Sequence, residues 1–204
     1  MSHKSISRRL RAKPRQKNPE RLDMIREATI EDASSIAAIS LEIWFGTFLQ
    51  NGINAFFADY VLQRYTPDRY KEILSRDNEK IWVSQNSEGI DGFIRLITAS
   101  VAPATAYSDT EISTLYVQPR HHRRGIGQKL LEAAQQFCAE SGRPDIWLTV
   151  NPKNERAIKF YKRTGFEKFG ETHFRIGDQS YPNDVFRIVL ATGSRPSQSI
   201  HSLN

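Results

Sequence analysis

A strand, a glycine-containing loop and an amphipathic helix follow one another directly between Thr110 and Ala139, and this order constrains the fold more than any other feature of the sequence. The strand TEISTLYVQP ends at Pro119. The run HHRRGIG then leads into QKLLEAAQQFCAE, whose apolar residues recur at helical spacing. A strand joined to a helix in this way is typical of a sheet with helices packed on it.

Strand and helix signals alternate along the rest of the chain. The segment after Asp32, its predicted N-cap, has apolar residues at helical spacing, and Pro67 divides the aromatic-rich segment beyond it into two short helices. Two β-rich runs joined across Gly89 predict a hairpin. The remaining signals predict a strand at 24–29, a strand at 145–150, a helix at 154–165 and a last strand pair formed by GFEKFGE and DVFRIVL. The predicted fold class is α/β (α+β mixed), with helices packed on a mixed sheet.

The length of the chain fits one domain with two tails. The chain has 204 residues, of which 39% are hydrophobic, and typical domain sizes favour a single core. Residues 1–23 are basic and polar, and residues 192–204 are small and polar, so we expect both to be disordered tails around a domain at 24–191. Because the strand pattern begins at Met24, residues 1–23 can also be explained by an upstream start codon.

The positive charge of the chain is concentrated in the first 23 residues. The formal net charge is +6, with 29 Lys and Arg against 23 Asp and Glu. Residues 1–23 contain eight of the basic and two of the acidic side chains, so 21 of each sign remain in the rest of the chain. The chain beyond the basic tail is therefore neutral, which argues against nucleic-acid binding except weakly through that tail. The basic side chains of the tail are Lys4, Arg8, Arg9, Arg11, Lys13, Arg15, Lys17 and Arg21.

Several classes of protein are excluded by what the sequence lacks. No run approaches the ~18 consecutive apolar residues of a membrane helix, and the first residues do not resemble a signal peptide, so we expect a cytoplasmic protein. The one cysteine, Cys138, cannot form an internal disulfide and lies on a predicted buried helix face. His121 and His122 are adjacent in an Arg-rich loop without nearby Cys or carboxylates, so we expect no metal site.

The loop before the predicted helix has the features of a diphosphate site. Gly125 and Gly127 lack side chains, so a phosphate could approach the backbone, where free N–H groups and the helix dipole favour an anion. Arg123 and Arg124 add positive charge. Glycines at a helix start can also serve only a tight turn. A dinucleotide-binding fingerprint would need a glycine where this chain has Leu130, and the Gly-Lys-Ser/Thr of a Walker loop is missing.

The runs EISTLYVQPRHHRRGIGQKLL and IWLTVNPKNERAIKFYKRTGF resemble the two central motifs of the GNAT superfamily of N-acetyltransferases, in order and spacing over roughly residues 24–190. The pyrophosphate motif of that family, Gln/Arg-x-x-Gly-x-Gly/Ala, maps onto residues 122–127, with His122 in place of the usual Gln or Arg. The resemblance implies the GNAT fold, a central mixed, mostly antiparallel sheet with helices on both faces. It also implies acetyl-CoA as cosubstrate.

The same resemblance assigns the residues that bind acetyl-CoA. Backbone groups in the segment Leu115, Tyr116 and Val117 would pair with the pantetheine arm, as an added β-strand does. The amides of Arg123, Arg124, Gly125, Ile126, Gly127 and Gln128 would hold the pyrophosphate. Asn154 matches a polar residue that commonly contacts CoA, although Asn at a helix start can equally be a plain N-cap.

Two residues are candidates for the proton transfers. Tyr161 matches the tyrosine of the family that protonates the departing CoA thiolate, and the alternative is a core aromatic. Glu111 lies where some members carry a catalytic glutamate, and the alternative is an ordinary strand residue. A base is needed because an amine with a pKa near ~10.4 is almost all ammonium at pH 7. The Leu115 N–H would stabilise the oxyanion.

The last strands and four carboxylates of the sequence bear on the identity of the acceptor amine. The last strands are similar to those of bacterial spermidine/spermine acetyltransferases of the PaiA kind, in the G-x-x-x-F-x-x-G-D spacing from Gly170 to Asp178. A polyamine would need carboxylates near the sulfur atom, and the candidates are Glu42, Asp59, Asp109 and Glu111. A protein N-terminus, a protein lysine and another small amine are alternative acceptors. A non-catalytic CoA-binding module and a homodimer are also compatible with the sequence.

Overall fold

The computed structural model describes residues 24–49, 51–103 and 108–190 of the chain. The two predicted tails, 1–23 and 192–204, lie outside the described residues. Helices form where the sequence predicts them, including the break at Pro67, which is the first residue of its helix and therefore needs no N–H partner. The helices are α1 (Ala33–Phe48), α2 (Ala55–Arg64), α3 (Pro67–Leu74), α4 (Ile126–Glu140) and α5 (Glu155–Arg163), with short 3₁₀ helices at Ile30–Asp32 and Pro119–His121.

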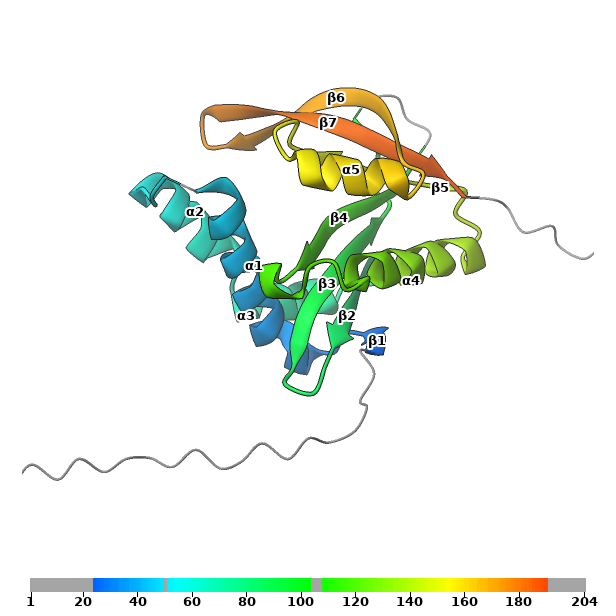
Figure 1. The fold of residues 1–204 in the computed structure, drawn as a ribbon, viewed down its shortest axis with the longest axis horizontal. Coiled ribbons are helices and arrows are strands. Elements are labelled where there is room, and N and C mark those ends of the chain that lie inside the picture. Colours follow the sequence, from blue (N-terminus) through cyan, green and yellow to red (C-terminus); the bar gives the residue numbers. More distant parts are fainter. Residues whose placement is uncertain (1–23, 50, 104–107, 191–204) are drawn as a thin grey trace, which may run out of the picture.

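Seven strands form one sheet in the order β1-β2-β3-β4-β5-β7-β6. All neighbours pair antiparallel except β4 and β5, which run parallel. The mixed, mostly antiparallel sheet confirms the predicted fold class (Figure 1). The strands are β1 (Met24–Glu27), β2 (Glu79–Gln85), β3 (Ile90–Thr98), β4 (Thr110–Val117), β5 (Asp145–Val150), β6 (Glu167–Ile176) and β7 (Gln179–Val189).

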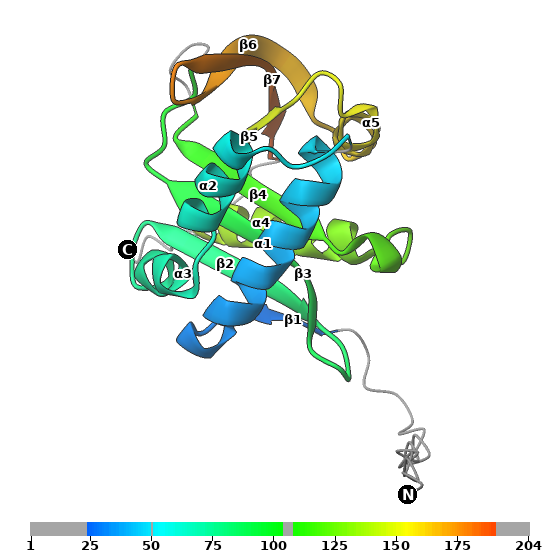
Figure 2. The ribbon, with the colours of Figure 1, turned by 90° about the vertical axis from the view of Figure 1, so that its left-hand side faces the viewer.

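Helices cover both faces of the sheet. Helices α1, α2 and α3 lie in front of the sheet in Figure 2, and α4 lies behind it. On the α1 face, Ile36 and Tyr70 pack against Phe93 of β3. On the α4 face, Leu130 packs with Ile94 of β3. Alternate residues of a strand therefore face opposite sides of the sheet and contribute to two separate cores. A side chain on β4 faces one core or the other.

The start of α1 differs from the prediction in one detail. Asp32 is the N-cap residue, but its carboxylate does not cap the helix. It instead accepts two hydrogen bonds from the Arg26 guanidinium, at 2.7 and 2.8 Å, and one from the Thr29 N–H at 2.8 Å. These bonds lower the pKa of Asp32. The carboxylate thus ties β1 to α1, a tertiary role that local sequence does not reveal.

The last two strands are longer than predicted. Gly177, with φ of 53°, and Asp178 connect β6 and β7 directly, so the segment between the two predicted runs is part of a long hairpin. A positive φ costs glycine little, which explains this turn. The hairpin extends past β5 toward α2, and Tyr181 of β7 packs against Phe57 of α2.

Cys138 lies fully buried in the α4 core, as predicted. Burial raises the pKa of its thiol to about 11, so the thiol is uncharged at neutral pH. No helix within the described ranges is long and apolar enough to span a membrane.

Candidate functional site

The sheet is split between β4 and β5. These parallel strands are in register at a single pair, Glu111 and Trp147, whereas all six residues of β5 are in register with β7. Between β3 and β4 the register shifts, because Arg95 faces Thr114 and the next residue of β3 faces Ile112. The extra residue on β4 is Ser113. A bulge of this kind bends a strand, which is consistent with β4 diverging from β5 after Glu111.

Beyond the bulge, every second residue of β4 directs its backbone N–H and carbonyl groups toward the split. The N–H of Gln118 donates to the Asp91 carbonyl at 2.9 Å, and a side chain at Gly92 would lie 2.8 Å from the Tyr116 carbonyl oxygen. Tyr116 and Gln118 therefore direct their backbone groups toward β3. Because backbone groups alternate along a strand, those of Leu115 and Val117 face the split. The predicted pairing with pantetheine is geometrically available to these two residues.

Tyr116 differs from its neighbours. Its ring lies on the α1 face, 5.7 Å from the ring of Phe93 at an interplanar angle of 78°. Burial raises the pKa of its hydroxyl, which also lies near Tyr65. Its predicted contact with CoA stays a prediction, one that its backbone direction does not support.

The glycine loop has the conformation of an exposed turn into a helix. Arg123 and Gly125 both have positive φ, 65° and 79°, and Gly125 is the N-cap residue of α4. The N–H groups of the following residues, Ile126, Gly127 and Gln128, have no partner within the helix because they occupy its first turn. A Cβ at Gly125 would meet no atom within 4 Å. The exposed side chains of Arg123 and Arg124 lie beside these amides in sequence. The residues present therefore fit a diphosphate.

The histidine at the first position of the motif binds the end of β4. His122 Nε2 lies 2.7 Å from the Val117 carbonyl oxygen. Burial lowers the pKa of His122 although the hydrogen bond to that carbonyl opposes the shift, so the neutral ring donates its Nε2–H to Val117 at neutral pH. The Val117 carbonyl is thereby occupied, while its N–H still faces the split. Among the residues that the structure describes, no three His, Cys, Asp or Glu side chains gather to form a metal site.

Tyr161 lies on the α4 face of the sheet. It is 8% exposed and packs edge-on against the rings of Phe160 and Phe166, with centroids 5.3 and 5.5 Å away. Its hydroxyl makes no hydrogen bond to the described residues. Burial raises the pKa of this hydroxyl, so it carries its proton at neutral pH. The residue is therefore a core aromatic whose hydroxyl carries a proton, and its role as general acid stays a prediction.

Glu111 lies on the opposite face, at the point where the split begins. Its neighbour Ile112 belongs to the α4 core, so the Glu111 side chain faces the other way. Ser100 Oγ donates to Glu111 Oε2 at 2.6 Å, and the Ser100 carbonyl accepts from Trp147 Nε1 at 2.8 Å. These contacts fix the carboxylate beside its β5 neighbour. Sequence analysis missed Ser100, because a serine eleven residues away carries no local signal.

Helix α5 lies beside the glycine loop and the end of β4. Asn154 is the N-cap of α5, and its side-chain oxygen accepts from the Ala157 N–H at 3.1 Å. The plain capping role is thus observed, and a contact with CoA stays a prediction. A Cβ at Gly127 would lie 3.7 Å from the Phe160 ring and 3.9 Å from Val117 Cγ2. The loop, the end of β4 and α5 therefore meet at Gly127.

Four carboxylates are candidates for binding the acceptor amine, and three of them are either paired with another residue or exposed. Glu42 accepts from Gln118 Nε2 at 2.6 Å, Asp109 pairs with Arg143 at 3.2 Å, and Asp59 is exposed on α2. Glu111 alone of the four lies at the split. Aromatic side chains form a cluster between α1, α2 and the β6–β7 hairpin, in which the Trp44 ring is 5.8 Å from that of Tyr60.

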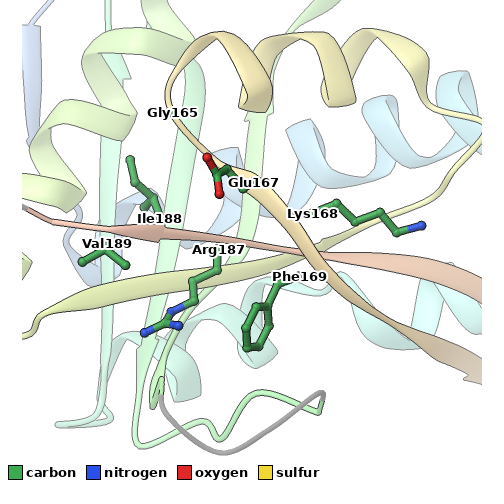
Figure 3. A pocket seen from close by; sticks show the side chains of 7 residues that line it. All are labelled: Gly165, Glu167, Lys168, Phe169, Arg187, Ile188 and Val189. Atoms are coloured by element: carbon green, nitrogen blue, oxygen red, sulfur yellow. The ribbon is translucent and has the colours of Figure 1, made fainter.

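A hollow of about 320 Å³ lies on the β6–β7 side of the sheet (Figure 3). The side chains of Phe169 and Arg187 lie side by side in it, with the guanidinium carbon 5.4 Å from the ring centroid. Arg187 also pairs with Asp145 at the beginning of β5, the end remote from the split. Its cation is already satisfied, and the hollow contains none of the predicted site residues. Its lining residues are Gly165, Glu167, Lys168, Phe169, Arg187, Ile188 and Val189.

A mixed sheet split beside a glycine loop at a helix N-terminus is the arrangement predicted for an acyl-CoA-dependent acyltransferase. Comparison with known proteins identifies the family. Residues 46–166 match the acetyltransferase (GNAT) family. The chain belongs to this family. It is 32% identical over 120 residues to an uncharacterized N-acetyltransferase of Mycobacterium tuberculosis, covering 59% of this chain and 73% of that protein. It is 25% identical over 120 residues to N-acetyltransferase 8 of Homo sapiens, covering 59% and 52%.

Solved structures show the same fold. The PaiA N-acetyltransferase from Thermoplasma acidophilum, in complex with coenzyme A, superposes with a TM-score of 0.66 at 20% identity, covering 81% of this chain and 98% of that one. A GCN5-related N-acetyltransferase from Rhodopseudomonas palustris gives a TM-score of 0.64 at 16% identity, covering 82% and 96%. The chain thus has the GNAT fold, and its family match together with its N-acetyltransferase relatives identifies it as an acetyl-CoA-dependent acyltransferase.

Proposed function

We propose that the protein transfers an acetyl group from acetyl-CoA to a primary amine by direct attack, with both substrates bound together. The observation that carries the proposal is the split beyond Glu111, beside which the glycine loop, the end of β4 and α5 meet at Gly127. When bound, acetyl-CoA supplies a thioester that an uncharged amine can attack. The C–N bond forms, the C–S bond breaks, and one proton leaves the amine while another reaches the sulfur.

The chain would handle these two protons with different residues. Glu111, oriented by Ser100, accepts the amine proton directly or through water. Tyr161 donates its phenolic proton to the sulfur. The Leu115 N–H, which faces the split, donates to the carbonyl oxygen as charge develops there. Burial raises the pKa of Tyr161, and the same exclusion of water would raise the pKa of the CoA thiol. The pKa values of the proton donor and the proton acceptor therefore shift in the same direction.

The acceptor would approach from the α1 face, where Glu111 and the Trp44 cluster lie. A small amine, such as a polyamine, suits a site with a single carboxylate, Glu111, better than a peptide does. The coenzyme A complex of PaiA is a precedent for the fold only.

The test is an amine panel with acetyl-CoA, assayed by thiol release and by mass spectrometry of the acetylated product. Polyamines, amino acids, a lysine peptide and a peptide with a free N-terminus form the panel. Turnover of a small amine at least tenfold above the peptides supports the proposal. Turnover confined to the peptides replaces the small amine with a protein acceptor, and CoA binding without turnover of any amine overturns the catalytic function.

A further inference from the structure

Arg64, the last residue of α2, is a cation that pairs with no carboxylate among the described residues. In the described part of the chain from Met24 to Arg120, every other arginine forms an ion pair with an acidic side chain. These pairs are Arg26–Asp32, Arg69–Glu72, Arg76–Glu79, Arg95–Glu79 and Arg120–Glu42. The planar guanidinium of Arg64 is therefore free to bind an anion from outside the protein.

The side chain of Arg64 lies against aromatic rings. Its guanidinium carbon is 5.8 Å from the centroid of the Tyr60 ring and 6.0 Å from that of Tyr65. Desolvation lowers the pKa of this guanidinium although the residue is exposed, and the neighbouring tyrosines raise the pKa by more. The cation is thus accessible to a ligand and is less screened by water than a fully solvated one, which strengthens its attraction for a negative charge.

The tyrosines connect Arg64 with the end of β4. The Tyr65 hydroxyl lies close to the Arg64 guanidinium and to the Tyr116 hydroxyl. The ring of Tyr116 lies on the α1 face, the face that also carries the Glu111 side chain. Tyr116 directly follows Leu115, whose N–H the proposed function assigns to the thioester oxygen. Arg64 therefore lies on the acceptor side of the sheet, close to the proposed reaction centre.

The charges on this face distinguish between the possible acceptors. Glu42, another carboxylate of the α1 face, accepts from Gln118 and faces Arg120. A polyamine carries a second ammonium group, which Arg64 would repel. An amine that carries a carboxylate would instead give the guanidinium its missing partner, with two parallel hydrogen bonds. The Tyr65 hydroxyl can donate a further bond to the same carboxylate.

We propose that the acceptor is an amine that also carries a carboxylate, such as an amino acid, and that Arg64 binds this carboxylate while the amine lies at the thioester. Arg64 selects which amine is bound and takes no part in bond formation, which proceeds as in the proposed function. This inference rests on the proposed function and narrows the class of its acceptor.

The test compares each amino carboxylate with its carboxamide, which keeps the amine and the size but removes the negative charge. Glycine, β-alanine and 4-aminobutyrate give three such pairs, with one to three carbons between the two groups. The full chain is assayed with acetyl-CoA by thiol release. We expect the kcat/KM of the wild type to favour the carboxylate at least tenfold in the pair whose length fits the site.

Arg64→Gln should reduce this preference by about 10- to 100-fold, the usual effect of losing a hydrogen-bonded charge. The carboxylate changes the pKa of the amine equally for both proteins, so this effect cancels when the two preferences are compared. Arg64→Lys keeps the charge without the planar fork and should give an intermediate preference. Arg69→Gln, at an exposed arginine of α3 that pairs with Glu72, is the matched control and should stay within twofold of the wild type.

Each outcome decides the inference. No preference in the wild type, a preference that persists in Arg64→Gln, or faster turnover of polyamines than of every amino carboxylate overturns it while leaving acetyl transfer intact. A lower melting temperature of Arg64→Gln with an unchanged preference overturns it too, because Arg64 would then only stack on its tyrosines. Absence of turnover with any amine overturns the proposed function and this inference together.

Discussion

Substitutions of Gly127 by a small and by a large side chain should separate stability from ligand binding, because the two depend on different properties of this position. Gly127 is helical, and the added Cβ would make only ordinary contacts, at 3.7 Å to Phe160 and 3.9 Å to Val117. Alanine is the better helix former by up to about 1 kcal/mol. For a chain of this size such a gain raises the melting temperature by about 2–4 °C. The apo protein should therefore be stabilised.

Ligand binding should depend on the size of the side chain at this position. The family motif admits Gly or Ala here, so Gly127→Ala should leave CoA affinity little changed. The larger side chain of Gly127→Leu would enter the space where the loop, β4 and α5 meet, and where we propose that the diphosphate and pantetheine bind. Overpacking of this kind costs about 1–3 kcal/mol, or roughly 5- to 150-fold in affinity. Differential scanning calorimetry of the apo protein and titration calorimetry with CoA measure the two effects, and an affinity of Gly127→Leu within twofold of wild type would refute the assignment of this position to the ligand site.

Two other glycines provide matched controls. Gly46→Ala, near the end of α1 with no atom within 4 Å of the added Cβ, should stabilise the fold similarly and leave CoA affinity unchanged. Gly125→Ala also meets no atom, but its φ of 79° is strained for alanine and should destabilise the protein by about 1–2 kcal/mol. Opposite stability changes at Gly125 and Gly127 would show that the motif needs its two glycines for different reasons.

Four further predictions concern the reaction and the chain ends. Tyr161→Phe should lower turnover about 10- to 1000-fold with CoA affinity and melting temperature little changed; full turnover under chemistry-limited conditions would make Tyr161 a packing residue. Glu111→Gln should show a defect that shrinks as pH approaches the acceptor pKa, because free amine then forms unaided; a pH-independent defect would argue against a base. Hydrogen exchange at the Leu115 and Val117 amides should slow on CoA binding, whereas unchanged rates would rule out strand-like pairing. Deleting residues 1–23 should leave melting and turnover unaltered, and a large fall in either would show that the tail packs on the domain.

Local patterns predicted most of the fold because each element has its own signal. The break at Pro67, the turn at Gly89 and the helix after Gly125 follow from residues that restrict or free the backbone. The length of the β6–β7 hairpin was underestimated for two reasons. In its middle, THFRIGDQSYP, polar and apolar residues alternate only weakly, and Pro182 lies within the strand. Pairing with β6 forms that part of β7, and such pairing is tertiary information.

The candidate site was predictable where a motif spans a few residues and not where distant residues meet. The loop at 122–127 and Tyr161 lie within recognisable runs. Ser100 carries no such signal, because it reaches Glu111 only through the pairing of β3 with β4. Asp32 shows the same limit, since its carboxylate binds Arg26 on another element rather than the helix it begins.

The sheet tolerates the split between β4 and β5 because β5 is paired along its other edge with β7. All six residues of β5 pair with β7, and β7 in turn pairs with β6 along almost its whole length. On the other side, β4 is anchored through β3, where a side chain at Gly92 could not fit against the Tyr116 carbonyl. Two separately paired halves of the sheet thus meet at Glu111 and Trp147, leaving backbone groups of β4 without a strand partner. Unpaired groups of this kind normally require a partner or water, so a ligand that completes the ladder gains directional hydrogen bonds in a geometry the fold has already fixed.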